Sequence, residues 1–256
     1  MTPLYPLFLK LEGKRAVVVG GGPVGAHKAA ELARAGALVT VIARVPGDAV
    51  RALASGCVAV LMERAFVAGD TAGAGVVIAA TGDPAVDDAV AADARAHGAL
   101  VNVVDRTDAS EFYTGAVVRR GPVTVAVGTS GASPALARKV RERLEQVLPP
   151  TLGVLAEALG AARPQLLARF PSIAERARVL DSFVERAWFR FVAGPCGDTP
   201  HPGPSVGALR ERIDAAIADE LLGAGARASG TGPPAPPAAA EGHAEPDGAN
   251  GAGSPA

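Results

Sequence analysis

Short apolar runs alternate with longer helical patterns through the N-terminal part of the chain. The runs are rich in Val, Ile and Leu, and they occupy residues 16–19, 38–42, 58–62, 76–80 and 100–104. Residues 24–35 and 84–97, which lie between runs, have the alanine-rich pattern of helices. Continuous apolar strands separated by helices are typical of a parallel sheet that is covered on both faces. We therefore predict an α/β fold with a doubly wound parallel sheet.

A different pattern begins after residue 105. Residues 116–127 contain two strand-like runs with a turn at residues 120–122. Ser133 followed by Pro134 predicts a helix start, because serine is a favoured N-cap and proline fits the first helical position. The two prolines at 149 and 150 are expected to end this helix.

The rest of the chain is predicted to be helical and then disordered. Residues 151–192 have a helical pattern with expected breaks near Pro164 and Pro171, and a further amphipathic stretch covers residues 206–222. Residues 223–256 contain no Val, Ile, Leu, Met or aromatic residue. Such a segment has too little apolar surface to offset the entropy cost of folding, so we predict a disordered tail.

Composition narrows the classes of function. The 256 residues carry a net charge of −1, and 49% are hydrophobic but only 4% aromatic. We expect an aliphatic core, and the balanced charge argues against nucleic-acid binding. Cys57 and Cys196 lie far apart and form neither a metal motif nor a disulfide framework, which favours the cytoplasm. We see no signal peptide pattern and no apolar run that would span a membrane, so no membrane association is expected.

A glycine motif follows the first apolar run. Gly20, Gly22 and Gly25 complete G-x-G-x-x-G between a predicted strand and a predicted helix. This context indicates a Rossmann-like dinucleotide site, in which the helix N-terminus faces the pyrophosphate. The alternative is a structural turn of an α/β protein.

Two further positions bear on the cofactor. Arg44 ends the second run, where an acidic residue usually binds the ribose of NAD. The sequence leaves three roles open for Arg44: it binds a 2′-phosphate and so favours NADP, it packs on the adenine, or it points to solvent. Thr81 follows the fourth run and is a second candidate contact. The alternative for Thr81 is an ordinary strand-to-helix turn with Asp83 at the helix start.

The fifth run and the later helix start supply candidate reactive groups. Asp105 ends the fifth run, where a carboxylate can act as a base, although Asp also commonly caps strands and turns. Ser130 and Ser133 form a polar helix start that suits an anion. Three nearby arginines add positive charge: Arg119, Arg120 and Arg138. A capped surface helix with solvated arginines is the alternative. The four histidines are scattered, so we predict no metal site.

Several segments occur in the order found in one known family. They are "PLFLKL" at residues 6–11, "NVVD" at 102–105 and "TSGASPALAR" at 129–138, together with the glycine motif. Through them the chain closely resembles the precorrin-2 dehydrogenase/sirohydrochlorin ferrochelatase family, the siroheme synthase module. The resemblance implies oxidation of precorrin-2 to sirohydrochlorin with NAD. In some members the same site then inserts Fe²⁺ to give siroheme, so iron is a possible substrate rather than a bound cofactor.

The resemblance also assigns roles to residues. Asp105 matches the family's catalytic Asp, which serves as the base in dehydrogenation and assists pyrrole N–H deprotonation during chelation. Pro23 and Val24 match cofactor positions in the glycine turn, and Arg44 and Val45 match those after the second strand. Arg44 therefore does not argue against NAD. Thr129 stands where some members have a serine, and it joins the predicted substrate contacts.

The organisation of the family implies a homodimer in which each chain consists of four segments. These are an NAD-binding Rossmann domain at 1–112, a dimerisation segment at 113–148, a helical domain at 149–222 and the tail at 223–256. Two alternative functions stay open. One is another NAD(P)-dependent oxidoreductase of small molecules, and the other is an NAD(P)-binding regulatory module without catalysis.

Overall fold

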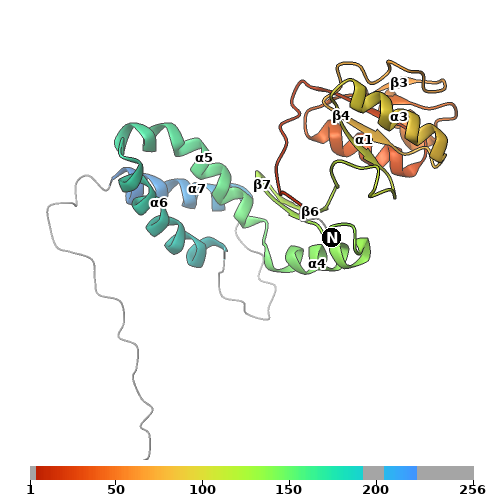
Figure 1. Ribbon diagram of the computed structural model, residues 1–256. Coiled ribbons are helices and arrows are strands. Elements are labelled where there is room, and N and C mark those ends of the chain that lie inside the picture. Colours follow the sequence, from red (N-terminus) through yellow and green to blue (C-terminus); the bar gives the residue numbers. More distant parts are fainter. Residues whose placement is uncertain (1–3, 193–204, 224–256) are drawn as a thin grey trace, which may run out of the picture. The chain divides into compact units, whose positions relative to one another are not determined.

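The computed structural model describes residues 4–192 and 205–223. The chain divides into two compact units between Glu157 and Ala158, and Figure 1 shows both. Residues 224–256, where the sequence predicts a disordered tail, lie outside the described residues. None of the described helices combines the length and the apolar character needed to cross a membrane.

A five-stranded parallel sheet forms the centre of the N-terminal unit. Its strands are β1 (Arg15–Val19), β2 (Leu38–Ile42), β3 (Val60–Met62), β4 (Val76–Ala79) and β5 (Leu100–Val103). Their order in the sheet is β3-β2-β1-β4-β5. The predicted doubly wound parallel sheet is therefore confirmed. The direction of winding reverses between β1 and β4, and a crevice that binds ligands in such folds lies at this point.

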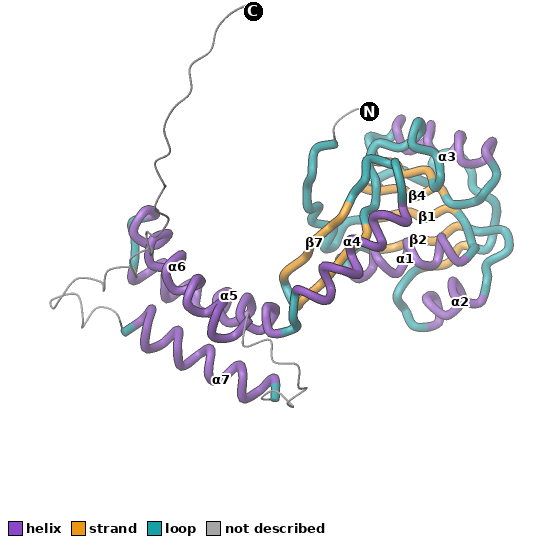
Figure 2. The backbone as a smooth tube through the Cα atoms, turned by 90° about the horizontal axis from the view of Figure 1, so that it is seen from below, coloured by secondary structure: helices purple, strands orange, loops and turns teal. Residues whose placement is uncertain are grey.

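Helices cover both faces of the sheet because alternate strand residues point to opposite sides. On one face, α1 (Pro23–Arg34) and α2 (Asp48–Ser55) pack on Val18, Val41 and Ile78. On the other, α3 (Pro84–Ala96) packs on Val17, Val77 and Val101. Figure 2 shows α3 across the sheet from α1 and α2. The apolar pattern does not predict α2 (Asp48–Ser55), which is short and whose only fully buried residue is Val50.

A β-hairpin and a helix complete the N-terminal unit. β6 (Ala116–Arg120) pairs antiparallel with β7 (Val123–Val127), and α4 spans Pro134–Val147. The predicted hairpin and helix start are confirmed, and the Ser133 hydroxyl accepts a hydrogen bond from the Leu136 N–H at 3.2 Å.

The second unit is helical. The helix α5 (Thr151–Arg169) enters it and is followed by α6 (Ile173–Ala187), the π-helical η1 (Trp188–Val192), α7 (Val206–Ala216) and the π-helical η2 (Ile217–Leu222). The predicted break at Pro171 is present, but the break near Pro164 is wrong because α5 runs through that residue. A stripe at helical spacing is buried on both sides of Pro164: Leu155, Ala158, Ala162 and Leu166. This burial outweighs the one backbone hydrogen bond that proline removes.

Candidate cofactor and substrate site

Two of the three motif glycines are required by packing within the protein. Gly20 has a φ of 136°, and a Cβ added to it would lie 2.2 Å from the Ala80 carbonyl oxygen. A Cβ on Gly25 would lie 2.3 Å from the Gly20 carbonyl oxygen. These approaches bring the ends of β1 and β4 and the start of α1 together. The turn is therefore as tight as a dinucleotide site needs.

Gly22 differs from its two partners in the motif. It is the N-cap of α1 with a φ of −78°, and no atom lies within 4 Å of its Cβ position. The first helical hydrogen bond runs from the Ala26 N–H to the Gly22 carbonyl at 3.0 Å. The N–H groups of Val24 and Gly25 precede it and have no partner within the helix. An open space in front of helix N–H groups fits a pyrophosphate, so the residues present suit a dinucleotide.

The loop after β2 forms a wall of the same turn. The Gly47 N–H donates to the Gly21 carbonyl at 2.9 Å, and a Cβ on Gly21 would lie 2.6 Å from the Val45 carbonyl oxygen. Arg44 and Val45 are both exposed, as are Pro23 and Val24. The structure thus brings the predicted cofactor positions from α1 and from the end of β2 to one rim.

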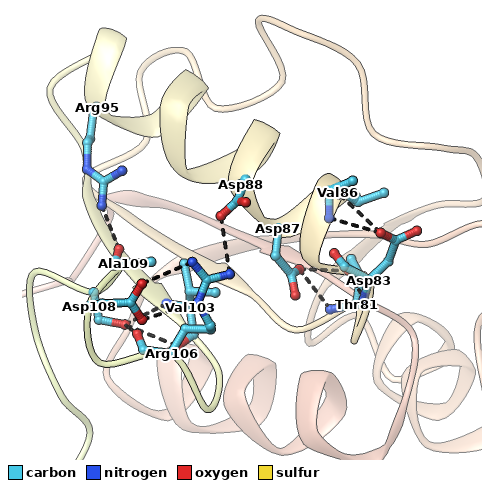
Figure 3. Close-up of polar contacts among 12 residues, drawn as sticks. Thr81, Asp83, Val86, Asp87, Asp88, Arg95, Val103, Arg106, Asp108 and Ala109 are labelled. Carbon is cyan, nitrogen blue, oxygen red and sulfur yellow. Dashed lines mark hydrogen bonds and ion pairs between the residues drawn. The ribbon is translucent and has the colours of Figure 1, made fainter.

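Thr81 lies at the end of β4, next to the carbonyl of Ala80 that Gly20 approaches. Its hydroxyl donates to the Asp87 carboxylate at 2.7 Å and accepts from the Asp83 N–H at 3.1 Å (Figure 3). Asp83 in turn accepts from the Ala85 N–H and caps α3. The Thr81 hydroxyl is therefore used inside the turn, while its position borders the glycine turn.

Asp105 sits at the tip of a tight turn just beyond β5. The Arg106 N–H donates to the Val103 carbonyl at 3.1 Å, and Asp105 between them has a left-handed φ of 61°. Its side chain is exposed. Within the described part of the chain, no hydrogen bond or ion pair engages the Asp105 carboxylate. That carboxylate is available to a ligand.

Neighbouring side chains hold this turn in place. The Ser110 hydroxyl accepts from the Val103 N–H at 2.9 Å and donates to the Arg106 carbonyl at 2.7 Å. The Arg106 guanidinium lies 3.3 Å from Asp88 on α3 and 3.1 Å from Asp108 (Figure 3). The same guanidinium lowers the pKa of Asp108 below its ordinary value. The backbone around Asp105 is thus fixed from both sides. Sequence reasoning missed Ser110, because no motif marks a serine that closes a turn.

The loop before α4 packs against the Asp105 turn. Ser130 and Gly131 both have left-handed backbone, with φ of 52° and 82°. A Cβ on Gly131 would lie 2.8 Å from the Thr107 side chain, two residues beyond Asp105. The Thr129 hydroxyl accepts from the Ser133 N–H at 3.1 Å. The structure therefore brings the predicted serine loop beside Asp105, with Ser130 exposed and the other two hydroxyls bound locally.

The three predicted arginines separate. Arg119 pairs with Glu31 of α1 at 3.1 Å. Arg120 donates to the carbonyls of Leu148 and Glu145 at 2.6 and 2.8 Å, so its charge lies at the C-terminal end of α4. Arg138 is exposed on α4. Substrate contact by these arginines stays a prediction. Among the described residues, no group of three His, Cys, Asp or Glu side chains gathers as a metal site would.

Comparisons with known proteins agree with this geometry. A family model described as "Putative NAD(P)-binding" matches residues 7–116, and one described as "Sirohaem biosynthesis protein central" matches residues 120–146. The siroheme synthase of Methylococcus capsulatus is 40% identical over 213 residues, which cover 83% of this chain and 43% of that protein. The siroheme synthase of Chromobacterium violaceum is 37% identical over 229 residues, which cover 86% and 47%. The chain therefore spans less than half the length of these relatives.

A solved structure shares the fold. The protein named "SirC, precorrin-2 dehydrogenase" superposes with a TM-score of 0.62 at 20% identity. The match covers 83% of this chain and 100% of that one. It supports the architecture of a parallel sheet followed by a hairpin and helices.

Proposed function

We propose, because the chain belongs to the siroheme synthase family, that it oxidises precorrin-2 to sirohydrochlorin with NAD as the oxidant. The observation that carries the proposal is the uncommitted carboxylate of Asp105 at the carboxyl edge of the sheet. Val19, Ala79 and Val103 lie in register at the ends of β1, β4 and β5. Two strand spacings, about 10 Å, therefore separate the end of β1 from the end of β5. A substrate on Asp105 and a dinucleotide on the glycine turn are within reach of each other.

The reaction removes two electrons and two protons from the macrocycle. A bound NAD supplies the acceptor for one hydrogen with both electrons. Asp105 accepts the second hydrogen as a proton, since its carboxylate is exposed and makes no hydrogen bond or ion pair with the described residues around it. The fixed turn around it holds the carboxylate at one place relative to the glycine turn, which lowers the entropy cost of reaching the reactive geometry.

Polar groups around the serine loop suit a substrate with several carboxylates. Ser130 is exposed beside the Asp105 turn, and Arg138 is exposed on the helix that follows. The hydroxyls of Thr129 and Ser133 stabilise the loop instead of facing a ligand. We assign Ser130 and Arg138 to substrate contact, with Arg119 as a further cation nearby in sequence.

Iron insertion and homodimer formation belong to the same proposal. The Asp105 carboxylate that accepts a proton in oxidation is also suited to accept pyrrole N–H protons when Fe²⁺ enters sirohydrochlorin. Exposed apolar side chains suit a dimer contact, among them Leu7, Phe8 and Val147, which are 61%, 75% and 66% exposed. A second copy that covers these side chains would remove them from water.

Anaerobic incubation with precorrin-2 tests the proposal. NAD⁺ and NADP⁺ are supplied separately, and absorbance follows the appearance of sirohydrochlorin. We expect turnover with NAD⁺ that Asp105→Asn lowers by orders of magnitude while cofactor binding is retained. No spectral change with either cofactor in folded protein would contradict the proposal and favour a binding module. Adding Fe²⁺ to the product, against a control without enzyme, tests the second step.

A further inference from the structure

A cavity with one polar and one apolar side lies along α1, beyond the glycine turn. It has a volume of about 210 Å³ and is bounded by α1, β4, β6 and the segment that leads into β6. Lys28, Thr114 and Arg119 line its polar side, and Leu32, Ile78 and Phe112 line its apolar side. A charged end opposite an apolar wall is typical of a site for an amphipathic small molecule.

The charges in this cavity are unevenly paired. Glu31 forms ion pairs with Arg34 and, at 3.1 Å, with Arg119. The Lys28 ammonium donates to the Thr114 hydroxyl. Among the described residues, no carboxylate lies within ion-pair distance of Lys28. Burial lowers the pKa of Lys28 and the nearby charge of Glu31 offsets this only in part. A half-buried ammonium whose partner is a neutral hydroxyl favours the arrival of an anion.

We propose that this cavity binds the carboxylate of a small aliphatic acid group. Lys28 receives the carboxylate, Thr114 and Arg119 supply further donors, and the carbon chain lies on Leu32 and Phe112. The volume equals that of about seven water molecules, which suits an acid group of a few carbons. It is smaller than the usual range for whole drug-sized ligands, about 300–1,000 Å³.

One chemistry has two possible sources. The carboxylate belongs either to a side arm of the anionic substrate or to a free small acid that acts as an effector. The first source rests on the proposed function, and the second does not. Both require the same ammonium at Lys28, so a single set of variants serves for both.

The test combines glutarate binding with steady-state kinetics on the full chain. Lys28→Met removes the charge and keeps much of the side-chain length, and Lys14→Met makes the same change at an exposed lysine outside the cavity. Glutarate binding is followed by NMR titration. We expect Lys28→Met to weaken it at least tenfold and Lys14→Met to leave it unchanged. Thr114→Val keeps the ammonium but removes one proposed donor, so it should weaken glutarate binding a few-fold and it tests the site if Lys28→Met fails to fold.

The kinetic arm distinguishes the sources. A substrate arm in the cavity predicts that Lys28→Met raises KM for precorrin-2 about tenfold with kcat and NAD affinity nearly unchanged, and that glutarate competes with precorrin-2. A free acid predicts glutarate binding without competition. Glutarate binding that is absent, or equal in folded Lys28→Met and wild type, together with an unchanged KM, overturns the site. The titration needs no turnover, so it stands even if precorrin-2 is not oxidised.

Discussion

Two glycines of the turn, Gly22 and Gly25, are predicted to respond differently to a single methyl group. Gly25→Ala places a Cβ 2.3 Å from the Gly20 carbonyl oxygen, about 1 Å closer than ordinary contact. Because backbone lies on both sides of this contact, the start of α1 must move away from β1. Gly22→Ala places its Cβ in open space on a backbone with a φ of −78°, which alanine adopts without strain.

The expected magnitudes follow from these geometries. Overpacking of this kind costs about 1–3 kcal/mol or more. For a unit of this size, each kcal/mol lowers Tm by about 2–4 °C, so Gly25→Ala should lose roughly 2–12 °C. Gly22→Ala changes only an N-cap and should cost about 1 kcal/mol or less. Its Cβ, however, occupies the space in front of the α1 N–H groups, and losing one such contact to pyrophosphate should weaken NAD binding at least about tenfold.

Thermal unfolding without cofactor and NAD titration by calorimetry separate the two effects. Gly25→Ala should have a clearly lower Tm than wild type. Gly22→Ala should have nearly the Tm of wild type but a lower affinity for NAD. Gly160→Ala, in α5 with nothing within 4 Å of its Cβ position, is the control that should leave NAD affinity unchanged. If Gly22→Ala binds NAD with wild-type affinity, no dinucleotide lies against this turn. If Gly25→Ala melts with wild type, the packing argument is wrong.

Three further predictions concern the supports of the site and of the fold. Ser110→Ala removes the hydroxyl that holds the turn of Asp105, so kcat should fall about tenfold while KM and NAD affinity change little. Ser110→Thr retains a hydroxyl and should recover most of the rate. An equal loss of kcat in both variants would contradict a positioning role for Ser110. Burial raises the pKa of Asp93, but hydrogen bonds from the Thr71 hydroxyl and two backbone N–H groups lower it below its ordinary value overall. The folded Asp93 carboxylate therefore contributes stability above the unfolded pKa of about 3.9. This stability is lost as pH falls through the lower pKa of the folded state. Urea unfolding between pH 2 and 6 should show that the free energy of unfolding depends less on pH in Asp93→Asn than in wild type. Arg120→Met leaves two carbonyls at the end of α4 without their donor. It should lower the free energy of unfolding in urea by about 1–3 kcal/mol without affecting NAD binding. An unchanged unfolding midpoint would refute this prediction.

The sequence was sufficient for the sheet because its signals are local. Each buried strand is a continuous apolar run, and the glycine motif marks where the first of them turns into a helix. The hairpin and the start of α4 are also marked by adjacent residues, such as Ser133 followed by Pro134. The helix α2 was not predictable because one buried residue in two turns leaves almost no periodic pattern. The continuity of α5 escaped because a proline is a local signal, while the burial that overrides it depends on tertiary packing.

The site was only partly predictable for the same physical reason. Position along the chain placed Asp105 and the glycine turn at one edge of the sheet, since parallel strands end together. The residues that fix them act over distances that no motif encodes. Gly20 is required by the Ala80 carbonyl, and Lys28 meets Thr114 on a segment 86 residues away. Such contacts form only when the chain folds and brings residues that are distant in sequence together.

Hydroxyl side chains show a further limit of reading a site from sequence. Thr81, Thr129 and Ser133 all lie where a ligand was expected, yet each hydroxyl bonds to its own turn or helix start. Short polar side chains near helix starts compete with ligands because the backbone there offers unpaired N–H groups. Among the described residues, three other than glycine have left-handed backbone: Cys57, Asp105 and Ser130. All three are exposed, and Asp105 and Ser130 lie on neighbouring loops. A non-glycine residue in that conformation costs about 1 kcal/mol or more, and this strain is consistent with the roles proposed for the Asp105 and Ser130 side chains.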